Sequence, residues 1–310
     1  MPPKISVVTL NWNTKLETTK CVKSLQKIDF PEFEIIIVDN GSEDGSAEYF
    51  EKSFGDTVKI IKNETNLGYS AGFNIGIDKA IANGAEYVLI INSDTIVDSE
   101  ILKELLKVFS EGKKIGFVTG KVKFMIGDKK TDIIQTIGKS SHHIFLVSGQ
   151  IGAGEKDIGK YDKIKELEFC DDVFMLVSRD VIREVGSYDP DFFLQCEQAD
   201  WQLRAKKCGF RVFFTPHAQI WHKGSISTGG DDSPKRHYFG SRNRILLVSK
   251  NGSRLQLLKL FLYLIFYDLP LRSLSFITKN KLALVSARLH GLFSGIIWFL
   301  NHNPKNQYTK

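Results

Sequence analysis

The chain has 310 residues, 42% of them hydrophobic and 25% charged, which is typical of a soluble globular protein large enough to bury a substantial core. Its four cysteines form no Cys-x-x-Cys pair, so we expect a reducing cytosol rather than a zinc knuckle or a secreted disulfide framework. The net charge of +6 is unevenly divided, because residues 235–310 carry thirteen Lys or Arg and one acidic residue. That region has a net charge of +12 and the first 234 residues have −6, which indicates two regions with different roles.

The first 110 residues alternate short apolar runs with helical patterns. The apolar runs predict strands buried on both faces, at residues 5–10, 34–39, 58–62 and 87–91. The helical patterns occupy residues 15–27, 46–54, 71–83 and 100–109. The N-terminus enters the first strand directly, so no signal peptide is expected. The order βαβαβαβ with short connections predicts an α/β protein with a parallel, right-handed, doubly wound sheet.

Such a sheet usually binds a nucleotide, but two common phosphate-binding motifs are missing. The turn after the first strand lacks Gly-x-Gly-x-x-Gly, and no complete Walker motif occurs. A nucleotide held here needs other contacts. Asp39 can accept hydrogen bonds from a base or ribose, and the backbone around Thr9 and Asn11 can flank the base. The alternative for Asp39 is an Asx-turn with Gly41.

The run at 87–91 ends in Asn92, Ser93 and Asp94. Ligands of open α/β sheets lie beyond the carboxyl ends of the strands, so the Asp94 carboxylate is placed to hold a metal bound to a phosphate-bearing substrate. The alternative is a simple turn and helix start, since Ser99 and Glu100 open the next helical pattern.

Beyond residue 110 the pattern is less regular. Further strands are predicted at residues 116–124, 168–177 and 210–215. The segment 129–159 is rich in Gly, Ser and His, and we expect a flexible loop or edge region over the site. A turn is expected to begin at Pro216 and to lead to His222. That histidine is a ligand candidate only if the fold brings it near Asp94; otherwise it is a hydrogen-bonded structural residue.

Glu197 opens a helical segment that Gly209 ends. The helix dipole favours a negative charge in the first turn, and Asp200 lies on the same face three residues later. Either carboxylate could take a proton from an attacking hydroxyl near a metal at a strand end. The alternatives are that Glu197 caps the helix and that Asp200 forms a surface pair with Arg204.

Seven spaced motifs occur between residue 5 and about residue 250. They are VVTLNWN at 7–13, VDNGSEDGS at 38–46, NLGYSAGFNIG at 66–76, INSD at 91–94, REVGSYDPDFFLQCEQADWQLRAKKCG at 183–209, PHAQIWHKG at 216–224 and SRNR at 241–244. In this order and spacing the chain resembles an inverting family 2 glycosyltransferase of the GT-A fold, close to the bacterial rhamnosyltransferase-like members.

The resemblance implies a set of donor-binding, metal-binding and catalytic residues. The nucleotide-sugar pocket is expected to include Thr9, Asn11, Asp39, Asn40, Asn66, Asn92, Ser93 and Asp94. Asp94 fills the last position of the family's metal-binding Asp-x-Asp, whose first position is Asn92 here, and His222 corresponds to a second contact with the metal or the diphosphate. The base is expected at Glu197, with Asp200 as the second candidate, because Gln198 replaces the second residue of the family's Glu-Asp pair.

These placements predict an inverting hexosyltransferase for polysaccharide of the cell envelope. A sugar would move from a UDP- or dTDP-sugar to a saccharide or lipid-linked saccharide, with Mg²⁺ or Mn²⁺ on Asp94 and His222 stabilising the departing nucleoside diphosphate. Two other functions stay open. Gln198 is compatible with a non-catalytic saccharide-binding or scaffold protein of the same fold, and a nucleotidyltransferase would release pyrophosphate instead.

The charge division predicts a catalytic domain at residues 1–234 and a basic, apolar helical region at residues 235–310. The longest uncharged run of that region within residues 254–271 is 260–267, which is shorter than the roughly 20 residues of a spanning helix. We therefore expect amphipathic helices at the anionic inner face of the cell membrane. A packed helical subdomain or a homodimer contact is the alternative. Nucleic-acid binding is not expected, since no reading motif accompanies the charges.

Overall fold

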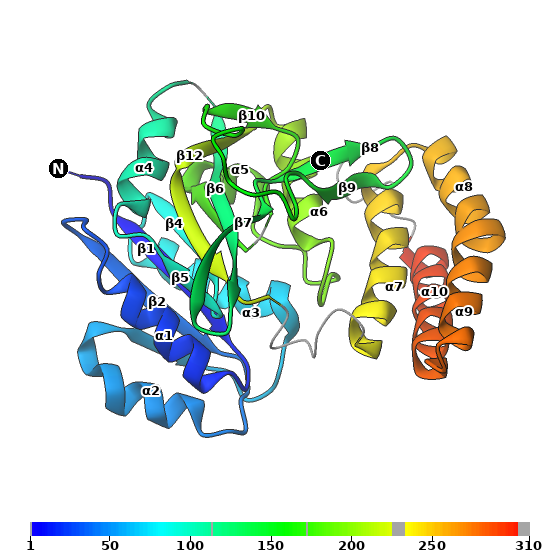
Figure 1. Ribbon diagram of the computed structural model, residues 1–310, viewed down its shortest axis with the longest axis horizontal. Coiled ribbons are helices and arrows are strands. Elements are labelled where there is room, and N and C mark those ends of the chain that lie inside the picture. Colours follow the sequence, from blue (N-terminus) through cyan, green and yellow to red (C-terminus); the bar gives the residue numbers. More distant parts are fainter. Residues whose placement is uncertain (1, 113, 172, 225–232, 303–310) are drawn as a thin grey trace.

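The computed structural model describes residues 2–112, 114–171, 173–224 and 233–302. An α/β body holds the first part of the chain, and a bundle of C-terminal helices lies beside it, yellow to red in Figure 1. A mixed sheet of ten strands forms the centre of the body, and a separate two-stranded hairpin lies near the helical bundle.

One half of the sheet is parallel, as predicted. Its strands are β1 (Ile5–Asn11), β2 (Phe33–Asp39), β3 (Lys59–Lys62) and β4 (Tyr87–Asn92). They lie in the order β4-β1-β2-β3, and each neighbouring pair is parallel. The polar residues that follow β1, β2 and β4 therefore meet at one edge of the sheet.

The other half of the sheet, beyond the four strands for which parallel pairing was predicted, is mixed. Its strands are β5 (Thr95–Val97), β6 (Ile115–Ile126), β7 (Lys129–Thr136), β10 (Lys165–Leu167), β11 (Phe174–Ser178) and β12 (Arg211–His222). β11 runs antiparallel to both β4 and β6, whereas β12 is parallel to β6. All five residues of β11 are buried, and a strand covered on both faces shows the same continuous apolar run in either direction.

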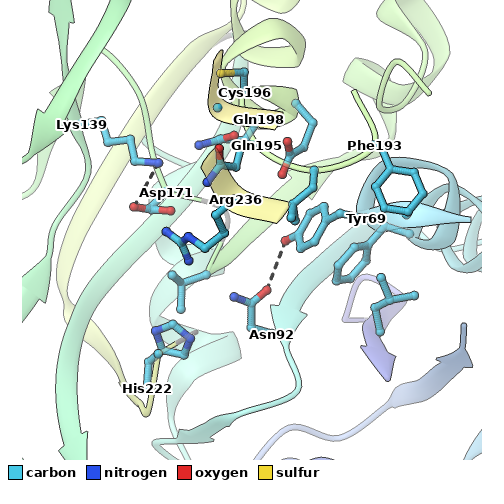
Figure 2. A pocket seen from close by; sticks show the side chains of 18 of the residues that line it. Tyr69, Asn92, Lys139, Asp171, Phe193, Gln195, Cys196, Gln198, His222 and Arg236 are labelled. Atoms are coloured by element: carbon cyan, nitrogen blue, oxygen red, sulfur yellow. Dashed lines mark hydrogen bonds and ion pairs between the residues drawn. The ribbon is translucent and has the colours of Figure 1, made fainter. Parts of the chain in front are cut away.

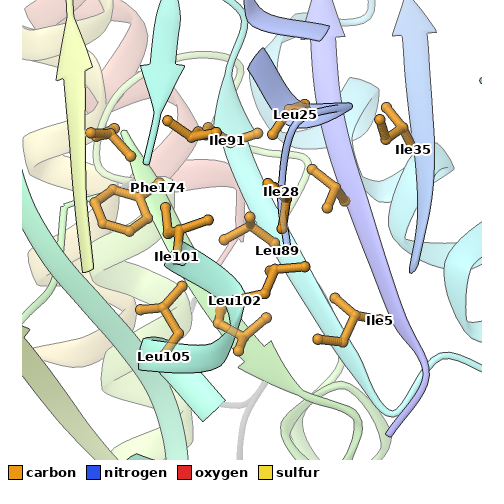
Figure 3. Close-up of a cluster of buried hydrophobic side chains, with 14 of the residues drawn as sticks. Ile5, Leu25, Ile28, Ile35, Leu89, Ile91, Ile101, Leu102, Leu105 and Phe174 are labelled. Carbon is orange, nitrogen blue, oxygen red and sulfur yellow. The ribbon is translucent and has the colours of Figure 1, made fainter. Parts of the chain in front are cut away.

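Helices cover both faces of the sheet, as expected. One face carries α1 (Lys15–Leu25), α2 (Ser46–Phe54), the short 3₁₀ helix η1 (Gly55–Thr57) and α4 (Ile101–Phe109). The other carries α3 (Gly68–Ala82), α5 (Arg179–Val185) and α6 (Glu197–Lys207). Alternate residues of each strand point to opposite faces. Leu89 and Ile91 of β4 thus pack against Leu102 and Leu105 of α4 in one core cluster (Figure 3), while Ile90 joins the other.

The structure decides between the two alternatives expected for one segment and corrects the turn expected at Pro216. The segment 129–159 contains β7 and the hairpin of β8 (Lys139–His142) and β9 (Leu146–Gln150), so it is an edge region with strands rather than a loop. The turn expected at Pro216 lies inside β12, where the register with β6 shifts between Phe214 and Gln219. A β-bulge of this kind bends a strand without ending it.

The C-terminal region is helical, as predicted. It comprises α7 (Pro234–Asn251), α8 (Arg254–Tyr263), the π-helical turn η2 (Leu264–Asp268), α9 (Leu269–Thr278) and α10 (Leu282–His302). α7 and α10 approach closely, because a Cβ atom added at Gly291 would lie 2.2 Å from the carbonyl oxygen of Tyr238. Arg288 of α10 forms an ion pair with the buried Asp268, which ties α10 to η2.

The apolar helices are longer than the sequence indicated. Residues Arg254–Thr278 form one helical run of 25 residues, and α10 has 21; both have a mean hydropathy of 1.5. By length and composition alone either helix could cross a membrane, so the short uncharged run at 260–267 does not exclude a spanning helix. In the most apolar 18-residue stretch of each helix, only 17% of the first and 33% of the second is buried. Exposed apolar side chains include Leu262, Phe266, Leu274, Phe293, Ile297 and Leu300.

Candidate active site

A cavity of about 900 Å³ opens at the polar edge of the parallel half-sheet. The ends of β1, β2 and β4 form its floor, and the start of α3, the hairpin β8–β9, the loop before α6, the end of β12 and one side of α7 form its walls. The C-terminal region therefore takes part in this cavity, because Lys235, Arg236, Arg244 and Leu247 of α7 line it.

Most of the expected site residues line the cavity. They are Asn40, Asn66, Asn92, Ser93, Asp94, Glu197 and His222. Four expected residues are not among those that line it: Thr9, Asn11, Asp39 and Asp200. The structure thus brings together around one cavity the polar residues after β4, the start of α6 and the end of β12. Thr9, Asn11 and Asp39, which were expected in the nucleoside pocket, are buried beneath it.

Asp94 and His222 lie side by side. His222 Nε2 is 3.0 Å from Asp94 Oδ1, and both side chains are almost fully buried. This contact follows from strand pairing, because β5 runs antiparallel to β12 with His222 opposite Thr95. The backbone amide of Lys223 also donates to the carbonyl oxygen of Asp94, at 3.1 Å.

The histidine is oriented by a residue that the sequence did not reveal. His222 Nδ1 lies 2.8 Å from Oε1 of Gln135 on β7. An amide oxygen only accepts, so Nδ1 carries the proton, and in a neutral ring the lone pair of Nε2 faces the Asp94 carboxylate. The lone pair of Nε2 and the negatively charged carboxylate repel each other unless a proton or a cation lies between them.

The donor set fits a divalent cation. Asp94 would hold the ion through a carboxylate oxygen and His222 through Nε2, and these two atoms lie 3.0 Å apart. Carboxylate and imidazole together suit Mn²⁺ as well. In the described parts of the chain no group of three or more His, Cys, Asp or Glu could hold a metal.

The expected nucleoside residues form a bonded layer under the cavity. Asn11 Nδ2 donates to Asp39 Oδ2 at 2.7 Å, and the amide of Ser42 donates to Asp39 Oδ1 at 3.0 Å. Asp39 thus orders the turn after β2. Asn40 reaches the cavity, and its Nδ2 donates to Asn66 Oδ1 at 3.1 Å. This bond joins the motif at 38–46 to the motif at 66–76.

The two candidate bases differ in position. Glu197 is the first residue of α6 and lines the cavity while only 2% exposed. Asp200 is fully buried, accepts from Arg204 Nε at 2.8 Å and accepts from Asn251 Nδ2 at 2.7 Å. Its pair with Arg204 is therefore part of the packing of α6, and Asp200 does not line the cavity.

Further polar residues in the cavity were not predicted. Tyr69 donates from its hydroxyl to Asn92 Oδ1 at 3.2 Å, and Lys139 lies 3.3 Å from the carboxylate of Asp171 (Figure 2). Arg236 projects into the same space in this view. Only Tyr69 lies within a recognised motif; the other three have no local signal that could have identified them.

A buried thiol lies under the floor of the cavity. Cys21 Sγ is 3.7 Å from the carbonyl oxygen of Asn92 and 3.4 Å from Thr95 Oγ1. Burial raises the pKa of this thiol to about 12, only partly offset by the hydrogen bond with Thr95, and the nearby Asp94 carboxylate raises it further. Cys21 therefore stays protonated at neutral pH and is not a nucleophile.

The fold is that of GT-A glycosyltransferases. TarS residues 1–349 from S. aureus, in complex with UDP-GlcNAc, aligns with a TM-score of 0.58 and 19% identity over 94% of this chain and 80% of that chain. The mannosyltransferase PcManGT from Pyrobaculum calidifontis, in complex with GDP-Man and Mn²⁺, aligns with a TM-score of 0.56 and 11% identity over 97% and 88%.

The family model described as Glycosyl transferase family 2 matches residues 6–186, and the chain belongs to this family. Among curated proteins, a poly-beta-1,6-N-acetyl-D-glucosamine synthase of Staphylococcus epidermidis is 25% identical over 265 residues. The match covers 85% of this chain and 60% of that synthase, so the chain corresponds to about three fifths of the relative's length.

Proposed function

We propose that the protein transfers a sugar from a UDP- or dTDP-sugar to a saccharide or lipid-linked saccharide, with inversion at the anomeric carbon. The observation that carries the proposal is the convergence of Asp94, His222 and Glu197 on one cavity of about 900 Å³. UDP-GlcNAc is the first donor to test, because TarS was solved with it and the curated relative is named for an N-acetylglucosamine polymer.

In this proposal Glu197 is the catalytic base. Its carboxylate takes the proton of the acceptor hydroxyl while the hydroxyl oxygen attacks the anomeric carbon from the side opposite the diphosphate. The bond to the diphosphate oxygen breaks in the same displacement, so the configuration inverts.

Asp94 and His222 would hold the Mg²⁺ or Mn²⁺. When bound, the cation would supply charge stabilisation for the leaving diphosphate. Asn92 keeps its side chain directed by the Tyr69 hydroxyl, and Asn40, Asn66 and Ser93 offer further hydrogen-bonding groups to the donor.

Membrane association is a second part of the proposal. The exposed apolar side chains of α8, α9 and α10, together with the positive charge of residues 235–310, fit the inner face of a cell membrane that carries anionic lipid. Flotation with phosphatidylglycerol vesicles tests it, and carbonate extraction separates surface binding from spanning. A vesicle-indifferent homodimer, seen by light scattering, would contradict it.

The function is tested by measuring the release of nucleoside diphosphate from UDP-GlcNAc, dTDP-rhamnose and other donors, with Mn²⁺ or EDTA. We expect release that depends on an acceptor and on the metal, and Asp94→Ala and Glu197→Gln are each expected to reduce it about 100-fold or more. Release of pyrophosphate would indicate a nucleotidyltransferase. Donor or saccharide binding without turnover would indicate the non-catalytic alternative.

A further inference from the structure

The turn that precedes the proposed base has an unusual backbone. Gln195 and Cys196 both have positive φ angles, of 72° and 70°. This left-handed conformation is disfavoured for residues other than glycine, and two such residues in succession need support from the surrounding structure. Because Glu197 follows directly, the conformation of this turn decides where its carboxylate lies.

One side chain of α7 holds the carbonyl groups of that turn. Asn243 Nδ2 donates to the carbonyl oxygen of Leu194 at 2.8 Å and to that of Gln195 at 2.9 Å. Asn243 is fully buried, and its Oδ1 accepts from Arg242 Nη1 at 2.8 Å. The same arginine nitrogen donates to the carbonyl oxygen of Asp191, also at 2.8 Å. All the hydrogen-bonding atoms of the Asn243 amide thus serve the loop that leads to Glu197, directly or through Arg242.

The rest of the loop is fixed independently of Asn243. Lys250 forms ion pairs with Asp189 and Asp191. On the opposite side, the amide of Tyr69 at the start of α3 donates to the carbonyl oxygen of Phe193 at 2.7 Å. Loss of the Asn243 amide would therefore free the turn at residues 194–196 while the beginning of the loop stays anchored.

We propose that Asn243 is a positioning residue for sugar transfer, which holds the left-handed turn at Gln195 and Cys196 so that Glu197 faces the acceptor. The inference rests on the proposed function, and it makes α7 part of the catalytic unit although α7 begins the basic C-terminal region. Asn243 does not line the cavity, so it acts through the backbone of the turn and not through substrate contact.

The same helix offers a matched control. Asn251, in the last turn of α7, also donates through Nδ2, at 2.7 Å to Asp200 Oδ1. That bond supports the packing of α6 away from the cavity. Asn251→Ala therefore removes a comparable hydrogen bond from α7, made to α6 itself, without freeing the turn before Glu197.

The test compares full-length Asn243→Ala, Asn243→Asp and Asn251→Ala with the wild type, using donor turnover and hydrogen exchange. Asn243→Asp keeps the size of the side chain but cannot donate to carbonyl groups. Both Asn243 variants are expected to lower kcat about 10- to 100-fold, because small misplacement of a reacting group has effects of that size. The KM for the donor should stay within about threefold, since the donor residues are held elsewhere. Amides of residues 194–198 should exchange faster, and the acid limb of the kcat–pH profile, which reports the base, should move.

Asn251→Ala should lower the melting temperature and leave kcat, the pH profile and the exchange at 194–198 unchanged. If Asn243→Ala does not fold, the isosteric Asn243→Asp decides the question. The proposal is overturned if a folded Asn243 variant keeps wild-type kcat, or if its kcat and KM do not differ from those of Asn251→Ala. Absence of wild-type turnover with every donor would refute the proposed function instead, and the exchange measurement would still decide whether Asn243 holds the turn.

Discussion

Replacement of Gln135 tests whether the Asp94–His222 pair is a metal site. Gln135 lies on β7, and its Oε1 accepts a hydrogen bond from His222 Nδ1 at 2.8 Å. This leaves His222 Nε2 facing Asp94 at 3.0 Å. Gln135→Leu keeps a similar volume and removes the acceptor. The imidazole is then free to take the other tautomer or to turn, so Nε2 is no longer held ready for a cation.

The size of the effect follows from the burial of the ring. His222 is only 5% exposed, so its Nδ1 proton cannot easily find water as a substitute partner. A buried donor without an acceptor costs about 1–3 kcal/mol. If that cost falls on the metal-bound form, it corresponds to roughly 5- to 150-fold in affinity. Residues that orient a metal ligand through a hydrogen bond typically contribute about 10- to 100-fold. We expect the concentration of Mn²⁺ for half-maximal activity to rise by about 10- to 100-fold.

The assay is a titration of Mn²⁺ against release of nucleoside diphosphate, with a parallel titration followed by thermal shift. Gln219→Leu on β12 is the control, since Gln219 does not line the cavity, and it should be activated like the wild type. An unchanged Mn²⁺ requirement in Gln135→Leu, with turnover retained, would refute the assignment of His222 as a metal ligand.

Two further predictions concern the buried body of the protein. Because the pKa of Cys21 is raised to about 12, its thiol should resist iodoacetamide in the native protein at pH 8 while the exposed Cys208 is modified, as mass spectrometry of tryptic peptides would show; fast labelling of Cys21 would contradict the burial. Gly120→Ala should lower the free energy of unfolding by about 1–3 kcal/mol, because the added Cβ would lie 2.0 Å from the backbone oxygen of Ala218. Urea denaturation measures this, and an unchanged midpoint would mean that β6 and β12 are less tightly packed than described.

The sequence was sufficient for the elements whose pattern is local. The strands at the start of the chain show short runs of aliphatic residues, and α2 begins at Ser46 and ends at Phe54 as predicted. The motif at Ile91 to Asp94 was recognisable because polar residues follow a buried strand directly. The family resemblance rested on such short segments, and the family model confirms it.

Contacts between distant segments could not be read in the same way. The periodicity of α6 places Glu197 and Asp200 on one side of the helix, but a helix rises about 1.5 Å per residue. Asp200 therefore lies about 4.5 Å further along the helix axis than Glu197, where Arg204 and Asn251 contact it. No local sequence pattern shows that Glu197 lines the cavity whereas Asp200 is packed between helices.

The sequence by itself determined the family, the alternation of strands and helices in the parallel half-sheet, and the position of polar residues at the strand ends, because each of these depends on neighbours within a few positions. The tertiary structure decided which of those residues meet. The antiparallel pairing of β5 with β12 places His222 against Asp94, the edge strand β7 supplies Gln135, and α7 supports the turn before Glu197 through Asn243. These contacts join segments far apart in the chain, and their geometry is set by packing that no single segment encodes.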